Sequence, residues 1–264
     1  MIIDLKGKTA LVTASTGGIG FAIAKALAES GAVVVINGRT KNSVDQAKDK
    51  LAAQVADASL HVAAADLGSN DGVQALVAQC PPIDILINNA GIYGQRDFYE
   101  TDDDTWERYW QTNVMSGVRL SRALTPAMVK KGWGRVVFIS SESARNIPAD
   151  MIHYGVTKTS QLSMSRGLAK RLAGTGVTVN AVLPGPTLSD GFAAMMQDEV
   201  ARTGKSVDEI AKAFVMAHRP SSIIQRAATV EEVANMVVYI SSLQASATSG
   251  AALRVDGGVV DDIV

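Results

Sequence analysis

Seven short runs of apolar and β-branched residues, separated by segments with helical spacing, constrain the fold of this chain more than any other feature. The runs, which we expect to form buried strands, cover residues 9–13, 32–37, 60–64, 83–88, 136–140, 177–183 and 251–255. The helical segments cover residues 19–30, 43–55, 71–79, 103–131, 151–173 and 230–242. This alternation predicts an α/β fold: a doubly wound, seven-stranded parallel sheet with right-handed crossovers and helices on both faces.

The 264 residues fit one α/β domain better than two small ones, since no linker, repeat or low-complexity tract interrupts the alternation. We therefore expect a single domain over residues 1–264. One stretch breaks the rhythm, at about residues 187–228, between the sixth strand and the last helix. It is longer than an ordinary connection and carries apolar side chains such as Phe192 and Phe214, so we expect a partly helical lid over the site. A simple packing subdomain is the alternative.

Charge and composition make several classes of function poor candidates. Hydrophobic residues make up 47% of the chain and charged residues 19%, as in a globular protein with a sizeable core. Lys and Arg total 25 against 26 for Asp and Glu, without a basic stripe, so we expect neither nucleic acid nor a membrane as partner. The single cysteine, Cys80, cannot form an internal disulfide, and no Cys/His cluster has metal-ligand spacing. With no apolar signal segment at the amino terminus, we expect a cytoplasmic protein without a metal site.

A glycine-rich turn, Thr-Ala-Ser-Thr-Gly-Gly-Ile-Gly at residues 13–20, follows the first strand and leads directly into a helix. Small residues let the backbone approach a pyrophosphate, and the helix amino terminus supplies free N–H groups and a positive dipole end. This position between strand and helix is the context of a dinucleotide-binding Rossmann fold.

The end of the second strand bears on the choice of cofactor. It reads Gly38-Arg39, where folds that bind NAD place an acid near the adenosine ribose. An arginine suits a 2′-phosphate instead. The sequence therefore favours NADP(H), with NAD(H) as the second choice. The alternative is that Arg39 is a solvated residue stacked beside the adenine without selecting the phosphate.

Tyr154 and Lys158 stand one turn apart if residues 151–173 are helical, which places an ammonium beside a phenol. A nearby cation favours the phenolate and should bring the pKa of the tyrosine down towards the range of a working general acid or base. Ser141 ends the fifth strand's apolar run, so its hydroxyl can hold a substrate oxygen, with Ser143 as a second candidate. His153 diverges from Tyr154 by about 100° on a helix, and we expect it at the surface.

Taken together, these residues resemble the short-chain dehydrogenase/reductase family in its ordinary form, over nearly the whole chain. The motifs that carry the resemblance are the loop at 13–20, Asp66-Leu67, Asn88-Asn89-Ala90-Gly91, Asn113, Ser141, Tyr154, Lys158, Pro184-Gly185 and Asp256-Gly257-Gly258. Three positions depart from the family pattern, one of them the conservative Ser189, which stands where a Thr often follows the Pro-Gly element. Ala14 replaces the first loop glycine, which requires a backbone angle that alanine tolerates. Gly17 stands where many NADP-using members carry a basic residue.

The resemblance implies a role for each of these residues. It makes Tyr154 the proton donor or acceptor, Lys158 the group that tunes it while binding the nicotinamide ribose, and Ser141 the group that polarises the carbonyl. Asn113 is implied to hold a water that links Lys158 to solvent. The residues implied to bind the cofactor are Ser15, Thr16, Gly18, Ile19, Gly20, Arg39, Asp66, Leu67, Asn89, Ala90, Gly91, Tyr154, Lys158, Pro184, Gly185 and Thr187.

The sequence therefore predicts an oxidoreductase that transfers a hydride between NADP(H) and a secondary alcohol or ketone, with Tyr154 as general acid or base. The substrate is expected to be a small or medium-sized, partly apolar carbonyl compound. The alternative is an NADP(H)-binding sensor or regulator on the same fold that performs no turnover. Like most of the family, the protein is expected to form a homo-oligomer, a tetramer or dimer, through the helices of residues 103–131 and 151–173.

Overall fold

The computed structural model describes residues 2–263 and contains the predicted seven-stranded parallel sheet, in the order β3-β2-β1-β4-β5-β6-β9. Its strands are β1 Thr9–Val12, β2 Val33–Gly38, β3 Leu60–Ala64, β4 Ile85–Asn88, β5 Gly134–Ile139, β6 Val177–Pro184 and β9 Ala252–Val255. The order reverses between β1 and β4, so the carboxyl ends of these two strands flank a crevice. The expected doubly wound Rossmann fold is thereby confirmed.

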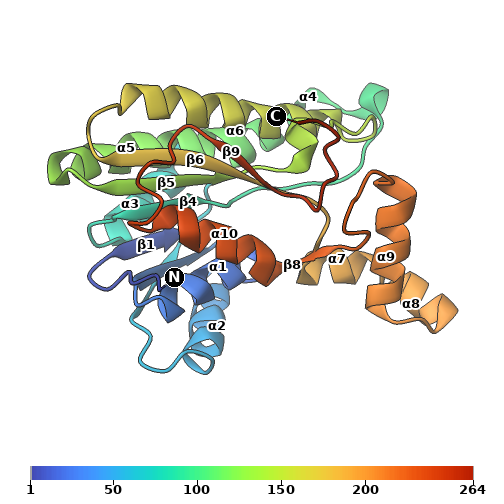
Figure 1. The fold of residues 1–264 in the computed structure, drawn as a ribbon, viewed down its shortest axis with the longest axis horizontal. Helices are drawn as coiled ribbons and strands as arrows, with labels where there is room; N and C mark the ends of the chain where they lie inside the picture. Colours follow the sequence, from blue (N-terminus) through green and yellow to red (C-terminus); the bar gives the residue numbers. More distant parts are fainter. Residues whose placement is uncertain (1, 264) are drawn as a thin grey trace.

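Helices cover both faces of the sheet (Figure 1). On one face lie α1 Gly18–Glu29, α2 Lys41–Ala52 and α10 Val230–Ser241, and on the other lie α3 Asn70–Gln79, α5 Ser116–Lys131 and α6 Ile152–Arg171. Successive strand side chains point to opposite faces. In β1, Val12 accordingly packs in the core under α1 and α10, whereas Leu11 packs under α3, α5 and α6. Burial on both sides explains why the strand sequences are apolar without alternation.

The predicted helix at 103–131 is interrupted. It consists of α4 Asp103–Tyr109, a π-helical turn at Trp110–Met115, and then α5. A single widened turn changes the direction of the side chains it carries and is frequent at functional sites. Asn113 lies in this turn, and its amide reaches Ile92 in the loop after β4, with Ile92 N donating to Asn113 Oδ1 over 2.8 Å. The sequence carried no signal for this interruption.

Residues 187–228 form a separate layer at the carboxyl end of the sheet, coloured orange in Figure 1. The segment contains α7 Asp190–Met195, α8 Gln197–Thr203 and α9 Val207–His218, and its ends pair as the short parallel strands β7 Thr187–Leu188 and β8 Ala228–Thr229. Its helices bury a small apolar cluster that includes Met196, Ile210 and Val215. The expected helical content of this stretch is therefore present.

Candidate active site

The glycine-rich turn after β1 is held by side chains from the neighbouring strand ends. Asn37, at the end of β2, accepts a hydrogen bond from Ala14 N over 3.1 Å, and Asn89 donates to the carbonyl of Ala14 over 3.2 Å. A Cβ on Gly20 would lie 2.5 Å from both the Ala14 carbonyl oxygen and Asn89 Nδ2. Only glycine therefore fits at position 20, and the tight turn brings the α1 amino terminus to the mouth of the crevice.

Ala14 adopts a left-handed backbone conformation with φ of 50°. The expectation that an alanine here meets an ordinary backbone angle is wrong, because the hydrogen bonds of Asn37 and Asn89 fix the turn in a shape that glycine prefers. A left-handed alanine costs about 1 kcal/mol relative to a right-handed one.

Replacing Ala14 with glycine is therefore expected to stabilise the fold by roughly 0.5–1 kcal/mol, since relief of the backbone strain exceeds the added freedom of the unfolded chain. Urea unfolding of the two proteins measures the difference. The matched control is Ala75→Gly, an exposed position in α3, where the same change should destabilise by about 1 kcal/mol. A loss of stability of similar size at both positions would contradict strain at Ala14.

Tyr154, Lys158 and Ser141 converge beyond the carboxyl end of β5. Ser141 follows the strand and caps a short helical turn, while Tyr154 and Lys158 come from successive turns of α6. Lys158 Nζ lies 5.6 Å from the centre of the Tyr154 ring and donates to the Ile139 carbonyl over 2.9 Å. A Cβ on Gly91 would lie 3.4 Å from Lys158 Nζ, so the loop after β4 closes the same space.

The polar groups of Asn113 bond to protein partners. Its Nδ2 donates to the Ile92 carbonyl over 3.0 Å and to Thr157 Oγ1 over 3.0 Å. The backbone carbonyl of Asn113 accepts from Gln161 Nε2 over 2.6 Å. These bonds tie the π-helical turn to α6 and to the loop after β4. The water relay from Lys158 through Asn113 stays a prediction.

The electrostatic relation between Tyr154 and Lys158 differs from the one expected. Burial raises the pKa of Tyr154, and hydrogen bonding with Ser141 opposes that rise only in part. Burial also lowers the pKa of Lys158 to about 7. In the bare protein burial outweighs the effect expected of the lysine charge, and the tuning of the phenol by Lys158 stays a prediction.

The converging groups border a cavity of about 390 Å³ that runs from the glycine-rich turn to the 187–228 segment. Ten of the sixteen expected cofactor-binding residues line it: Gly18, Ile19, Gly20, Asn89, Gly91, Tyr154, Lys158, Pro184, Gly185 and Thr187. Ser143 lines it as well, although residues 142–144 form a helical turn instead of extending the strand. The loop and the proton-transfer candidates thus share one space.

Six expected cofactor-binding residues lie outside this cavity. Ser15 is fully buried and donates to the Val12 carbonyl over 2.7 Å, so its side chain supports the turn from beneath. Arg39 and Asp66 are exposed beyond the ends of β2 and β3. The other three are Thr16, whose methyl group lies close to Gly38, and the buried residues Leu67 and Ala90. Arg39 forms no ion pair within residues 2–263.

A carboxylate from the 187–228 segment reaches the amino terminus of α1. Gly18 N donates to Asp190 Oδ2 over 3.4 Å, and a Cβ on Gly17 would lie 3.6 Å from the same oxygen. Free N–H groups and the positive end of the helix dipole attract an anion to such a position. The Asp190 carboxylate therefore stands where a phosphate group would bind.

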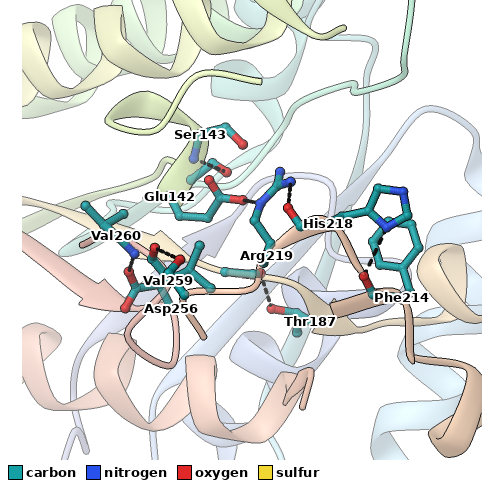
Figure 2. Close-up of polar contacts among 12 residues, drawn as sticks. Glu142, Ser143, Thr187, Phe214, His218, Arg219, Asp256, Val259 and Val260 are labelled. Carbon is teal, nitrogen blue, oxygen red and sulfur yellow. Dashed lines mark hydrogen bonds and ion pairs between the residues drawn. The ribbon is translucent and has the colours of Figure 1, made fainter. Parts of the chain in front are cut away.

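The far end of the cavity combines aromatic side chains with a partly buried ion pair. Tyr93, Phe192 and Phe214 line it, and the ring centres of Tyr93 and Tyr154 lie 6.4 Å apart. Figure 2 shows Arg219, which follows α9, pointing towards Glu142; its Nε donates to Glu142 Oε1 over 2.9 Å. Burial raises the pKa of Glu142, and the Arg219 charge opposes that rise. No sequence pattern indicates this pair, because its members are 77 positions apart.

His153 is buried, contrary to the surface position expected. Its ring packs edge-on against Tyr109, with the ring centres 4.4 Å apart, and 6.2 Å from that of Trp106. Burial lowers the pKa of His153, and the ring packs against the aromatic side chains of α4.

Within residues 2–263, no helix has the length and apolar character needed to span a membrane. In the same range, no three His, Cys, Asp or Glu side chains gather as a metal site would require.

The fold and the crevice define a Rossmann-type α/β protein. Residues 8–204 match the family model described as short chain dehydrogenase. The chain belongs to the short-chain dehydrogenase/reductase family of oxidoreductases, and the resemblance drawn from the sequence motifs is confirmed.

Several known proteins are similar over their full length. The uncharacterized oxidoreductase YvaG of Bacillus subtilis is 48% identical over 263 residues, which cover 100% of both chains. The 3-oxoacyl-[acyl-carrier-protein] reductase FabG of Salmonella typhimurium is 33% identical, with 97% of this chain and 99% of that protein covered. Among solved structures, L-sorbose reductase from Gluconobacter frateurii, complexed with NADPH and L-sorbose, superposes with a TM-score of 0.92 at 30% identity, covering 100% of both chains.

Proposed function

We propose that this protein is an NADP(H)-dependent oxidoreductase that interconverts a secondary alcohol and a ketone. The observation that carries the proposal is the convergence of Tyr154, Lys158 and Ser141 in the cavity that begins at the glycine-rich turn. Reduction of a carbonyl needs a hydride, a proton and a donor that stabilises the developing oxyanion. The nicotinamide supplies the hydride when it is bound, and the three side chains supply the rest.

The residues divide these tasks by position. Tyr154 moves the proton as general acid or base, and Ser141 donates a hydrogen bond to the substrate oxygen. Lys158 lies behind the phenol, where its charge stabilises the phenolate and its Nζ can bind a ribose hydroxyl. Asn113 holds the loop after β4 against α6 and is proposed to position the water that connects Lys158 to solvent.

The glycine-rich turn fits a dinucleotide pyrophosphate, because Gly20 leaves no room for a side chain and the α1 amino terminus faces the crevice. Asp66 and Leu67 are proposed to flank the adenine and Asn89 to Gly91 the ribose side. The proposed pyrophosphate contacts are Ser15, Thr16, Gly18, Ile19 and Gly20, and the proposed carboxamide contacts are Pro184, Gly185 and Thr187. Arg39, exposed and without an ion pair among the described residues, is proposed to bind the 2′-phosphate. L-Sorbose reductase, a similar structure, is solved with NADPH.

Replacing Arg39 with alanine is expected to weaken NADPH binding by about 10- to 100-fold and NADH binding by less than about threefold, since only NADPH carries the 2′-phosphate. Fluorescence titration of both cofactors measures the two affinities. Lys48→Ala, which removes an exposed charge from α2, is the control for a general change in charge. Equal losses for the two cofactors in Arg39→Ala would contradict the assignment.

The carboxylate of Asp190 competes with the cofactor phosphates for the α1 amino terminus. Replacing Asp190 with asparagine keeps its size and removes its charge, so NADPH affinity should rise by about three- to tenfold. The same titration tests this, with Asp198→Asn, an exposed acid in the first turn of α8, as control. Unchanged or weaker binding in Asp190→Asn would show that this carboxylate does not occupy the phosphate position.

We propose that residues 187–228 act as a lid of this single-domain enzyme, since Phe192, Met195 and Phe214 from this segment line the cavity. The substrate is then a small or medium-sized, partly apolar carbonyl compound. Known substrates of similar proteins include L-sorbose and 3-oxoacyl thioesters of acyl carrier protein, as their names state. We also propose a cytoplasmic homo-oligomer, a dimer or tetramer, assembled through α5 and α6; light scattering coupled to gel filtration measures its mass.

Turnover distinguishes an enzyme from a cofactor sensor on the same fold. The purified protein is mixed with NADPH or NADH and a panel of ketoses, ring ketones and 3-oxoacyl compounds, and the absorbance of the reduced cofactor is followed. We expect oxidation of NADPH with at least one class of carbonyl. Tight NADPH binding without oxidation by any member of the panel would favour the sensor.

A further inference from the structure

A second cavity, of about 550 Å³, lies at the amino ends of strands β5 and β6, whereas the crevice lies at the carboxyl ends of the strands. It is formed where β5 and β6 begin and where α5 and α6 end, and the residues that line it include Trp133, Arg135, Arg166, Lys170 and Thr178. β5 runs from Arg135 at this cavity to Ile139 at the active-site cavity. At about 3.3 Å per residue, the two cavities are separated by roughly 13 Å or more.

The charged side chains that line this cavity are all cationic, namely Arg135, Arg166 and Lys170. None of the three takes part in an ion pair within residues 2–263. The backbone carbonyl of Asp84 accepts from Arg135 N, but the Asp84 carboxylate is already paired with Lys131 and bonded to Thr9 N. The whole chain has a net charge of −1, so this local excess is not a sign of a generally basic protein.

Arg135 is the strongest member of this set because it is held in place. Arg135 is 2% exposed, and its guanidinium donates to the carbonyls of Ser242, Gly134 and Gly176 over 3.2, 2.8 and 3.4 Å. Carbonyl dipoles orient the group without neutralising it. A buried cation without a counter-ion is costly in free energy, and an anion in the cavity would offset that cost.

Two buried polar atoms beside the cavity also have no partner. Thr178 is 7% exposed and its Oγ1 forms no hydrogen bond among the described residues, and the same holds for Trp133 Nε1. Both residues line the cavity. Both atoms are inaccessible in this structure, so the cationic side chains, and not these two atoms, form the binding surface of the cavity. Arg166 Nη1 is oriented by the Gly250 carbonyl at 3.2 Å.

We propose that this cavity is a binding site for a small, multiply charged anion, a phosphorylated or polycarboxylate compound, distinct from the cofactor and substrate site. Three cations match an anion with two or three negative charges better than they match a single carboxylate. The Arg135 guanidinium, which is held by carbonyls, would attract one anionic group through its fixed charge. Arg166 and Lys170, exposed on one face of α6, would close on the remaining charge. The inference does not depend on the activity proposed above.

Isothermal titration with inorganic pyrophosphate and, separately, citrate tests this site. The protein is saturated with NADPH so that the glycine-rich turn cannot take the probe, and ionic strength is held constant because screening weakens such contacts. The variant is Arg166→Gln/Lys170→Gln, which changes two exposed positions and leaves Arg135 to support the fold. Arg171→Gln, the next residue of α6 and not part of the cavity wall, is the matched control.

We expect saturable binding of one anion per chain in the original protein and in Arg171→Gln, and an affinity at least about tenfold lower in Arg166→Gln/Lys170→Gln. Tighter binding of pyrophosphate identifies a phosphorylated ligand, and tighter binding of citrate a polycarboxylate. Turnover without added anion should be the same in all three proteins. Absence of saturable binding, or equal affinities in the three proteins, would overturn the proposal.

Discussion

Replacing Tyr154 with phenylalanine is expected to lower kcat by about a thousandfold while NADPH affinity stays within about twofold. The change removes one oxygen atom and its proton and keeps the ring that packs against Tyr93. The loss should fall on the chemical step because the hydroxyl is the only exchangeable proton this side chain can deliver. Steady-state kinetics with the best carbonyl from the panel, together with an NADPH titration, separates the two effects.

Tyr93→Phe is the matched control for Tyr154→Phe. It removes a hydroxyl from the neighbouring ring on the cavity wall, and it should lower kcat by less than about tenfold. If Tyr154→Phe retained ordinary turnover, the proton would have to come from another group and the assignment would be wrong. If both variants lost NADPH binding, the hydroxyls would be supporting the cofactor pocket instead of the reaction.

Replacing Lys158 with methionine is expected to abolish measurable turnover and, at the same time, to stabilise the fold by about 1–2 kcal/mol at neutral pH. The two effects have one cause, since a buried ammonium is useful to the reaction and unfavourable for folding. Lys158 is 5% exposed and, within residues 2–263, is bonded to a single carbonyl, that of Ile139, and to no carboxylate. Methionine keeps the length of the side chain without the charge, and the unpaired Ile139 carbonyl offsets part of the gain.

The stability gain in Lys158→Met should depend on pH in a definite direction. The pKa of Lys158 is about 7 in the folded protein and 10.5 in the unfolded chain. Between these values the unfolded chain binds more protons, so the penalty is complete below pH 7 and fades as the pH rises towards 10.5. Chemical denaturation of both proteins near pH 6.5 and near pH 9.5 should show the larger difference at the lower pH. A gain that grows with pH would show that the lysine is not destabilised by burial.

The arrangement of the fold could be read from the sequence because its signals are local. Each buried strand is an unbroken apolar run, and burial on both faces, seen at Leu11 and Val12, is what makes the run continuous. The approach of Tyr154 to Lys158 follows from the helical repeat alone. The glycine-rich turn was recognisable because Gly20 has no room for a side chain.

What escaped prediction depends on contacts between distant segments. The left-handed angle of Ala14 is fixed by Asn37, and the Glu142–Arg219 pair forms only because the residue after α9 returns to the end of β5. The raised pKa of Tyr154 reflects burial by several elements, which no spacing reveals. The hydrogen bond from Gly18 N to the Asp190 carboxylate joins residues that are 172 positions apart.

A crystal structure of the NADPH complex tests the central claim most directly, through the distances from nicotinamide C4 to Tyr154 Oη and Ser141 Oγ. We expect both oxygens to lie within hydrogen-bonding reach of one position for the substrate carbonyl oxygen. The carbonyl carbon bonded to that oxygen should then lie about 3–3.5 Å from C4. Lys158 Nζ should then contact the ribose, and Asp190 should have left the α1 amino terminus. A nicotinamide ring bound away from Tyr154, or a complex in which the phenol points out of the cavity, would contradict the account.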